Sequence, residues 1–160
     1  MIEFAIERAS EIEGEIRDLL PEHLGEFDIY EPPFEPVIDF PMYRAIDHAG
    51  RLLTVTARDD GVLVGYWLGL KFNDPHHHVR GHTAPVIMGQ VFHIRASYRA
   101  KIAKQMFQFM ESVAERGGAV AIAQRVRPKG GPRSGAFLEA IGYIAAEAVF
   151  VKPLGEARNA

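Results

Sequence analysis

The chain of 160 residues contains no cysteine. Disulfide bonds, a thiolate nucleophile and a zinc site built on cysteine are therefore excluded. It also lacks any apolar run of about 18 residues, the length that a membrane span needs. Its N-terminal stretch MIEFAIERASEIEGE is acidic and amphipathic, whereas a signal peptide is basic and then apolar. These absences predict a cytoplasmic protein with no membrane partner.

A large excess of charge of one sign is also missing. The formal net charge is -3 at pH 7, which argues against a general binder of nucleic acid. With 48% hydrophobic residues, the chain is long enough for one well-filled core and too short to expect two. The sequence therefore predicts a single domain, residues 1–155, followed by a tail, residues 156–160.

Acidic residues are absent from one informative segment, RASYRAKIAKQMF at residues 95–107, and none follows before Glu111. This segment has the pattern of a helix start, where the helix dipole already carries a partial positive charge. It nevertheless holds four cations, Arg95, Arg99, Lys101 and Lys104. A small, compact anion bound at the helix start would make this arrangement favourable. The alternative is a solvated basic face on an ordinary helix.

Hydrophobic periodicity predicts an alternation of strands and helices in the order β-α-α-β-β-β-α-β-α-β. A capping box of Ser10 and Glu13 is expected to open the first helix, and DDG to form the turn of a hairpin within residues 52–72. The segment NDPHHHVRGHTAP is interpreted as a polar connection. The later helix, residues 97–116, is expected to bury one face and to end at the following glycines; that face comprises Ile102, Met106, Phe109, Met110 and Val113.

Three stretches resemble the GNAT superfamily of N-acetyltransferases, and most closely its small bacteriophage-encoded members. They are RLLTVTARDDGVLVGY, VFHIRASYRAKIAKQMFQFME and SGAFLEAIGYIAAEAVFVKPL. The resemblance implies an α/β fold with a central mixed sheet flanked by helices. It also implies direct transfer of an acetyl group from acetyl-CoA to an amine acceptor, either a small molecule or a protein.

The same resemblance implies where acetyl-CoA binds. In the family, the strand before the basic helix pairs with the pantetheine amides and splays away from the next strand, while the helix start holds the pyrophosphate. The residues that correspond here are Phe92, His93, Ile94, Arg99, Ala100, Lys101, Ile102, Ala103, Lys104 and Ser134. This sequence departs from the family pattern because Lys101 stands where a glycine is usual and Tyr98 where Arg or Gln is usual.

Both usual catalytic positions of the family are altered. Gln90 stands where an acid often acts as base, and a glutamine can only orient a neighbouring group. Leu138 stands where a tyrosine commonly donates the proton. A histidine is therefore expected to act as the base, with His78 and His93 best placed. Activity should then rise with pH through an apparent pKa between about 6 and 7.5.

Two segments are candidates for binding the acceptor. In FDIYEPPFEP, the side chains of Tyr30, Glu31, Phe34 and Glu35 can select a cationic amine, or the segment is only a proline-stiffened cover. In the histidine-rich segment, His76 is expected to contact the acceptor. Alternatively, the histidines of this segment only fill the loop, or they form a site that suits zinc or nickel. We expect no metal, because Asp74 is the one carboxylate within that run.

Two other functions remain open at this level. The altered Gln90 and Leu138 positions also suit a GNAT-like protein that binds CoA without transfer. A phage protein directed at nucleic acid would use the basic cluster together with Arg125, Arg127, Lys129 and Arg133. Finally, the apolar last strand, residues 143–154, would leave an exposed sheet edge and so predicts a homodimer.

Overall fold

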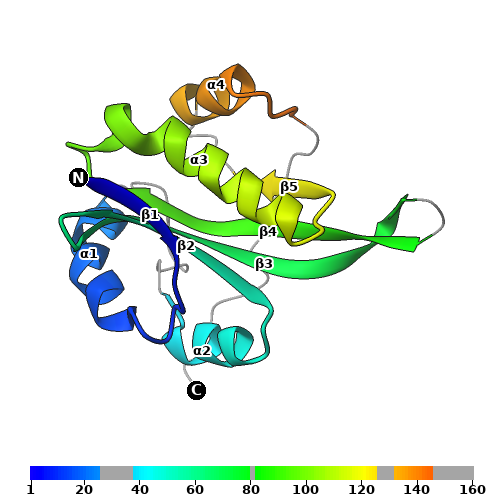
Figure 1. The fold of residues 1–160 in the computed structure, drawn as a ribbon, viewed down its shortest axis with the longest axis horizontal. Helices are drawn as coiled ribbons and strands as arrows, with labels where there is room; N and C mark the ends of the chain where they lie inside the picture. The colour runs from blue at the N-terminus through cyan, green and yellow to red at the C-terminus, as the bar shows by residue number, and fades with distance from the viewer. Residues whose placement is uncertain (26–37, 80–81, 126–131, 146–160) are drawn as a thin grey trace, which may run out of the picture. The chain divides into compact units, whose positions relative to one another are not determined.

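Five strands form one mixed sheet in the order β1-β2-β3-β4-β5 in a computed structural model, which describes residues 1–25, 38–79, 82–125 and 132–145 (Figure 1). Neighbouring strands are antiparallel from β1 to β4, and β5 is parallel to β4. The strands are β1 Ile2–Ile6, β2 Leu52–Asp59, β3 Val62–Val79, β4 His82–Ile94 and β5 Ala121–Gln124. The helices are α1 Glu13–Gly25, α2 Phe40–His48, α3 Arg99–Arg116 and α4 Pro132–Ala140. This arrangement confirms the predicted α/β fold.

The chain divides into two compact units. Met1–His23 and Asp39–Arg125 form one unit, which contains the sheet, α2, α3 and most of α1. The other unit comprises Leu24–Ile38 and Val126–Ala160 and includes α4. The single domain of residues 1–155 stays a prediction. The expected last strand falls almost entirely outside the described residues, so the homodimer stays a prediction as well.

The β2–β3 hairpin lies at the centre of the sheet, as the sequence predicts. Leu52 pairs with Leu70 at one end, and Asp59 pairs with Val62 next to the turn. The turn residues Asp60 and Gly61 have φ values of 47 and 83, so both adopt the left-handed conformation that a tight hairpin turn requires.

In the sheet unit, helices cover both faces of the sheet, with α3 on one face and α1 and α2 on the other (Figure 1). On the α3 face, Phe92 of β4 packs edge-on against Phe107, with ring centroids 5.0 Å apart. The next residue along β4, His93, points to the opposite face and stacks on His23 of α1. Successive side chains of a strand alternate in this way, so adjacent residues of β4 serve different faces.

The buried face of α3 agrees with the predicted periodicity at all but one position. Phe109, which was expected on the buried face, is only half-buried and stacks on Phe4 of β1. Phe107, which was not expected there, is buried. The buried residues of α3 are Ile102, Met106, Phe107, Met110, Val113 and Ala114. Of the helices in the described ranges, none combines the length and apolar character needed to cross a membrane.

The predicted capping box at the first helix is wrong. The helix begins at Glu13, and the hydroxyl of Ser10 donates instead to Oδ2 of Asp47 at 2.8 Å. The backbone N–H of Ser10 donates to the same carboxylate oxygen at 3.2 Å. Asp47 lies in the last turn of α2, so Ser10 ties the approach to α1 to a neighbouring helix.

The predicted polar connection between the two strands is also wrong. β3 continues to Val79 and β4 begins at His82, with His78 paired to Thr83. A long antiparallel arm therefore replaces the expected loop (Figure 1). Backbone pairing defines this arm, and a polar two-stranded ladder lacks the hydrophobic alternation by which strands are recognised.

Candidate functional site

β4 and β5 lie side by side over only part of the length of β4. Their parallel pairing begins at Val86 and Ala121 and ends at Gly89 and Gln124. β4 then continues to Ile94 while still paired with β3. Within the described ranges, residues 90–94 of β4 therefore have no strand on the β5 side, and their backbone groups form an open edge that can accept an extended ligand.

The single tryptophan of the chain lies at the point where these strands part. Trp67 of β3 donates from Nε1 to Oε1 of Gln124 at 2.8 Å. Beside this bond, a Cβ added at Gly89 would lie 2.1 Å from the same Gln124 oxygen and 2.8 Å from Trp67 Nε1. A side chain at the last paired position of β4 would therefore displace Gln124 or Trp67, and the hydrogen bond to Trp67 holds Gln124 where the open edge begins.

A β-bulge at Gln90 starts the open edge. Leu68 pairs with Val91 and Gly69 with Gly89, so Gln90 is the extra residue on β4. Its side-chain Nε2 donates to the carbonyl of Met88 at 3.3 Å. The structure therefore places this predicted residue beside the edge. Its amide can orient a polar group there, but it cannot take up a proton at neutral pH.

The open edge leads directly into the start of α3. Tyr98 occupies the N-cap position without a side-chain capping hydrogen bond, and the first turn contains no acidic residue. The first N–H groups of a helix have no acceptor within the helix, and the dipole adds partial positive charge there. Together these features form an environment that favours an anion.

The predicted cations surround this helix start in different ways. Lys101 and Lys104 are exposed, and Arg95 is half-buried. Arg99 donates from Nε to the carbonyl of Ile94 at 2.8 Å, which folds its guanidinium group back over the turn. Ile102 is only 2% exposed, so its backbone alone can contribute to a site.

Two carboxylates from other elements accept hydrogen bonds from the turn between β4 and α3. Glu22 of α1 accepts a hydrogen bond from the N–H of Ala96 at 3.0 Å. Asp59 accepts one from the hydroxyl of Tyr98 at 2.9 Å, and this bond raises the pKa of Tyr98. Glu22 already occupies the Ala96 N–H, and the N–H groups of Tyr98 and Lys101 donate to the carbonyls of Arg95 and Tyr98. An incoming anion would therefore meet other N–H groups of the turn and the lysines.

His93 lies at the core of the sheet unit, on the α1 side of β4. It is 1% exposed, and its ring stacks on that of His23 with centroids 4.7 Å apart. Nδ1 of His23 and the hydroxyl oxygen of Tyr66 are 2.6 Å apart and share a hydrogen bond. Burial lowers the pKa of His93 below its ordinary 6.5, so its ring is neutral at neutral pH, and the same burial makes it a weaker proton acceptor than an exposed histidine.

The other candidate base, His78, is far from His93. β3 pairs His78 with Thr83 and Tyr66 with His93. The ten residues from Thr83 to His93 span roughly 30 Å at about 3.3 Å per residue. His76 lies on the same distant arm as His78. The structure therefore does not bring the predicted histidines together.

Several predicted site residues cannot be placed at the open edge. Tyr30, Glu31, Phe34 and Glu35 lie outside the described residues. Ser134 is an exposed residue of α4 in the other unit, so its contact with CoA stays a prediction. Within the described ranges, no group of three or more His, Cys, Asp or Glu side chains is placed to hold a metal ion.

Sequence reasoning missed the residues that shape the site. Gln124 and Glu22 act through contacts with Trp67 and Ala96, which are distant in the sequence. No local motif marks such residues, because each partner belongs to a different element. The sequence offered one usable signal, the absence of acidic residues from the start of α3. The carboxylates that contact this turn come instead from other elements.

Comparisons with known proteins identify the fold. No protein-family model matches the chain, and no curated protein matches it significantly. Solved structures do match. AAC(6')-Iy in complex with the bisubstrate analogue CoA-S-monomethyl-acetylneamine is 20% identical with a TM-score of 0.69, over 97% of this chain and 99% of that one. Ribosomal-protein-alanine N-acetyltransferase from Brucella melitensis biovar Abortus 2308 is 19% identical with a TM-score of 0.70, over 96% and 99%.

A third match is an aminoglycoside acetyltransferase, HMB0005, from an uncultured soil metagenomic sample. It is 13% identical with a TM-score of 0.73, over 97% of this chain and 99% of that one. At such low identities the likeness is one of fold. The chain has the mixed-sheet fold of the GNAT acetyltransferases.

Proposed function

We propose that this chain is an N-acetyltransferase that binds acetyl-CoA along the open edge of β4 and transfers its acetyl group directly to an amine. One observation carries the proposal: the edge left where β4 and β5 part leads without interruption into a helix start that is rich in cations and has no acidic residue in its own first turn. The similar AAC(6')-Iy has been crystallised with CoA, which supports the same cofactor here.

Each part of CoA has a matching feature in this chain. Backbone groups of Phe92, His93 and Ile94 would pair with the pantetheine amides as an added strand would. The diphosphate would meet the first N–H groups of α3 and the charges of Lys101 and Lys104. Arg99, Ala100, Ile102, Ala103 and Ser134 complete the proposed cofactor contacts.

Direct transfer requires an amine nitrogen that has lost a proton. That nitrogen attacks the thioester carbonyl carbon, the carbon–sulfur bond breaks, and the CoA thiolate takes up a proton. We assign the base to His93, acting through water, because its ring is neutral and it lies on the strand that binds the cofactor. Gln90 would orient the reacting groups at the bulge. His78 is the weaker candidate, given its distance along the arm.

The finer features belong to the same proposal and have support from the sequence alone. They are membership of the small bacteriophage-encoded group, a cytoplasmic location, a homodimer, and an acceptor held by Tyr30, Glu31, Phe34, Glu35 and His76.

A second candidate function is CoA binding without transfer. It is favoured by the chemistry of Gln90, which lies at the bulge with its amide turned to Met88 and has no ionisable group. His93 is also deeply buried. In this case CoA and acetyl-CoA would bind, and no amine would be acetylated.

A thermal-shift screen with acetyl-CoA, CoA and a short DNA duplex tests the proposal. Ligand at 100 times its dissociation constant adds about 2.7 kcal/mol to the free energy of unfolding, which gives a clear rise in melting temperature. We expect this rise with both CoA species and none with DNA. A rise with DNA alone would contradict the proposal. An assay of free CoA release with a panel of amines then separates transfer from binding alone.

A further inference from the structure

A cavity lies in the sheet unit, at the C-terminal end of α3. It has a volume of about 710 Å³, in the range of small-molecule sites. β1, β2, β3 and β4 line it together with the last turns of α3 and the segment that follows them. From Arg99 to Val113, α3 rises roughly 21 Å at 1.5 Å per residue, so this cavity is well separated from the helix start.

The interior of the cavity is apolar, and its walls are held by backbone hydrogen bonds. Buried Leu53, Ile87 and Val113 line it from β2, β4 and α3. The N–H of Val120 donates to the carbonyl of Pro85 at 2.8 Å, which fastens the segment after α3 to β4. These contacts make the cavity a formed feature of the unit.

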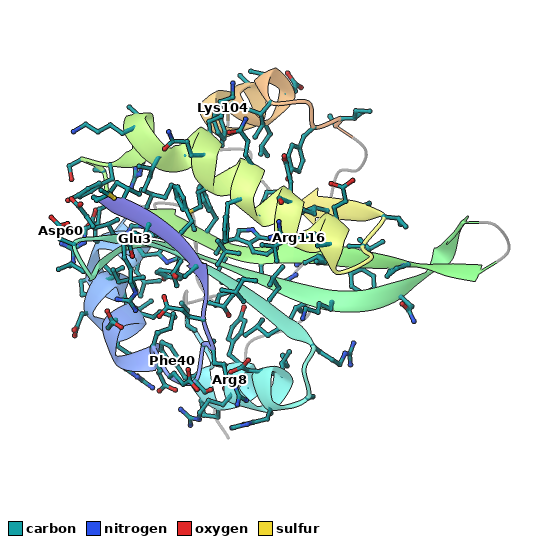
Figure 2. The ribbon with its side chains drawn as sticks, in the orientation of Figure 1. Glu3, Arg8, Phe40, Asp60, Lys104 and Arg116 are labelled. Atoms are coloured by element: carbon teal, nitrogen blue, oxygen red, sulfur yellow. The ribbon has the colours of Figure 1, made fainter. Side chains whose placement is uncertain are left out.

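Three cations from three parts of the chain line the same cavity. Arg51 precedes β2, Lys71 lies on β3, and Arg116 is the last residue of α3. The N–H of Lys71 donates to the carbonyl of Arg51 at 2.8 Å, so these two residues are neighbours across the hairpin. Figure 2 shows Arg116 on α3, toward the end opposite Lys104.

In the part of the chain that the structure describes, no carboxylate balances these charges. Among the described residues, none that lines the cavity is acidic, and none of the three cations forms an ion pair. The negative end of the α3 dipole favours Arg116 at its position. It does not account for Arg51 and Lys71, which belong to the hairpin.

We propose that this cavity binds a small organic anion with an apolar body, such as an aryl or medium-chain carboxylate. The apolar body of the ligand would pack in the apolar interior, and the three cations would bind its charged group. Three cations disfavour a protonated amine, so this would be a site distinct from that of the amine acceptor. The inference is independent of the proposed transferase activity, because it uses no residue of the β4 edge or of the α3 start.

Two fluorescent probes of matched shape test the proposal on the full chain. 8-Anilinonaphthalene-1-sulfonate carries an apolar body and one negative charge, and N-phenyl-1-naphthylamine has the same ring system without the charge. We expect the anionic probe to bind at least tenfold more tightly. Equal affinities for the two probes would overturn the proposal, because the cations would then have no role.

Paired charge reversals locate the site. Arg51→Glu with Arg116→Glu should lower the affinity for the anionic probe at least tenfold and change the affinity for the neutral probe less than twofold. Both arginines are exposed, so folding should survive. Arg99→Glu with Lys104→Glu makes the same change of charge at the other end of α3 and should leave the anionic probe unaffected. The opposite pattern would place the probe at the helix start and overturn the proposal.

A variant of unchanged charge completes the test. Ala119 lines the cavity, and Ala119→Leu would fill part of it. Both probes should bind at least threefold more weakly to this variant. Unchanged affinity for both probes would show that neither enters the cavity.

Discussion

Trp67 shapes the candidate site through its contacts with Gly89 of β4 and Gln124 of β5. Its side chain is fully buried, and its indole occupies the space above two glycines of the sheet. A Cβ added at Gly69 would lie 2.1 Å from the ring, and one added at Gly89 would lie 2.8 Å from Nε1. The same Nε1 holds Gln124 where β4 and β5 part. The glycines and the tryptophan thus form one packing arrangement.

Gly69→Ala should therefore destabilise the protein. The new Cβ would also lie 2.7 Å from Cγ2 of Ile87, and the indole is fully buried. Overpacking of this kind lowers the free energy of unfolding by about 1–3 kcal/mol, which urea denaturation measures.

Gly14→Ala is the matched control. Gly14 lies in α1 with no atom near its Cβ direction, so alanine should raise the free energy of unfolding by about 0.4–1 kcal/mol. A Gly69→Ala protein as stable as wild type would show that the Trp67 packing is looser than described.

The pH dependence of transfer tests the role of His93. The base must be neutral, so kcat/KM should rise with pH as His93 loses its proton. Burial is the main cause that lowers its pKa; Arg95 lowers it further, and Glu22 opposes the shift. The rise should therefore centre below the ordinary pKa of 6.5. His93→Gln should abolish this limb, while His78→Ala should retain it.

Two acceptors of different basicity distinguish a base on this chain from the acceptor's own ionisation. A limb that shifts with the pKa of the acceptor and survives His93→Gln would assign His93 a structural role only.

At the scale of the element, α3 combines a core-forming face with a cationic start. Met106 is 1% exposed on the buried face, and Gln105 beside it is exposed. Met106→Ala should lower the free energy of unfolding by about 2–5 kcal/mol, because it removes buried atoms and leaves a cavity. Gln105→Ala should change it by less than about 0.5 kcal/mol. Similar losses for both variants in thermal melts would contradict the described orientation of α3.

Elements with strong local signals could be predicted from the sequence. Asp60 and Gly61 specify the hairpin turn by their own backbone preferences, and the spacing of Ile102, Met106 and Met110 specifies a helix face. The arm that carries His78 could not be predicted, because its pairing with Thr83 depends on backbone hydrogen bonds between polar segments. The capping box failed because Ser10 has a tertiary partner, Asp47.

At the scale of the whole molecule, the site was predictable only in part. The cations of the α3 start were visible because charge is a property of single residues. The position where β4 and β5 part could not be predicted, because it depends on contacts among Trp67, Gly89 and Gln124, which lie on three strands. Sequence reasoning therefore predicted the cationic helix start of the candidate site and not the geometry of its open edge.

Calorimetric titration of acetyl-CoA tests the central claim most directly. Wild type should bind, and Arg99→Glu with Lys104→Glu should weaken binding at least tenfold, about 1.4 kcal/mol, because attraction for the diphosphate becomes repulsion. Arg51→Glu with Arg116→Glu applies the same change of charge at the far end of α3 and should leave the affinity within twofold of wild type. An affinity unchanged by reversal at the helix start, or lowered equally by both pairs, would contradict a CoA site at the start of α3.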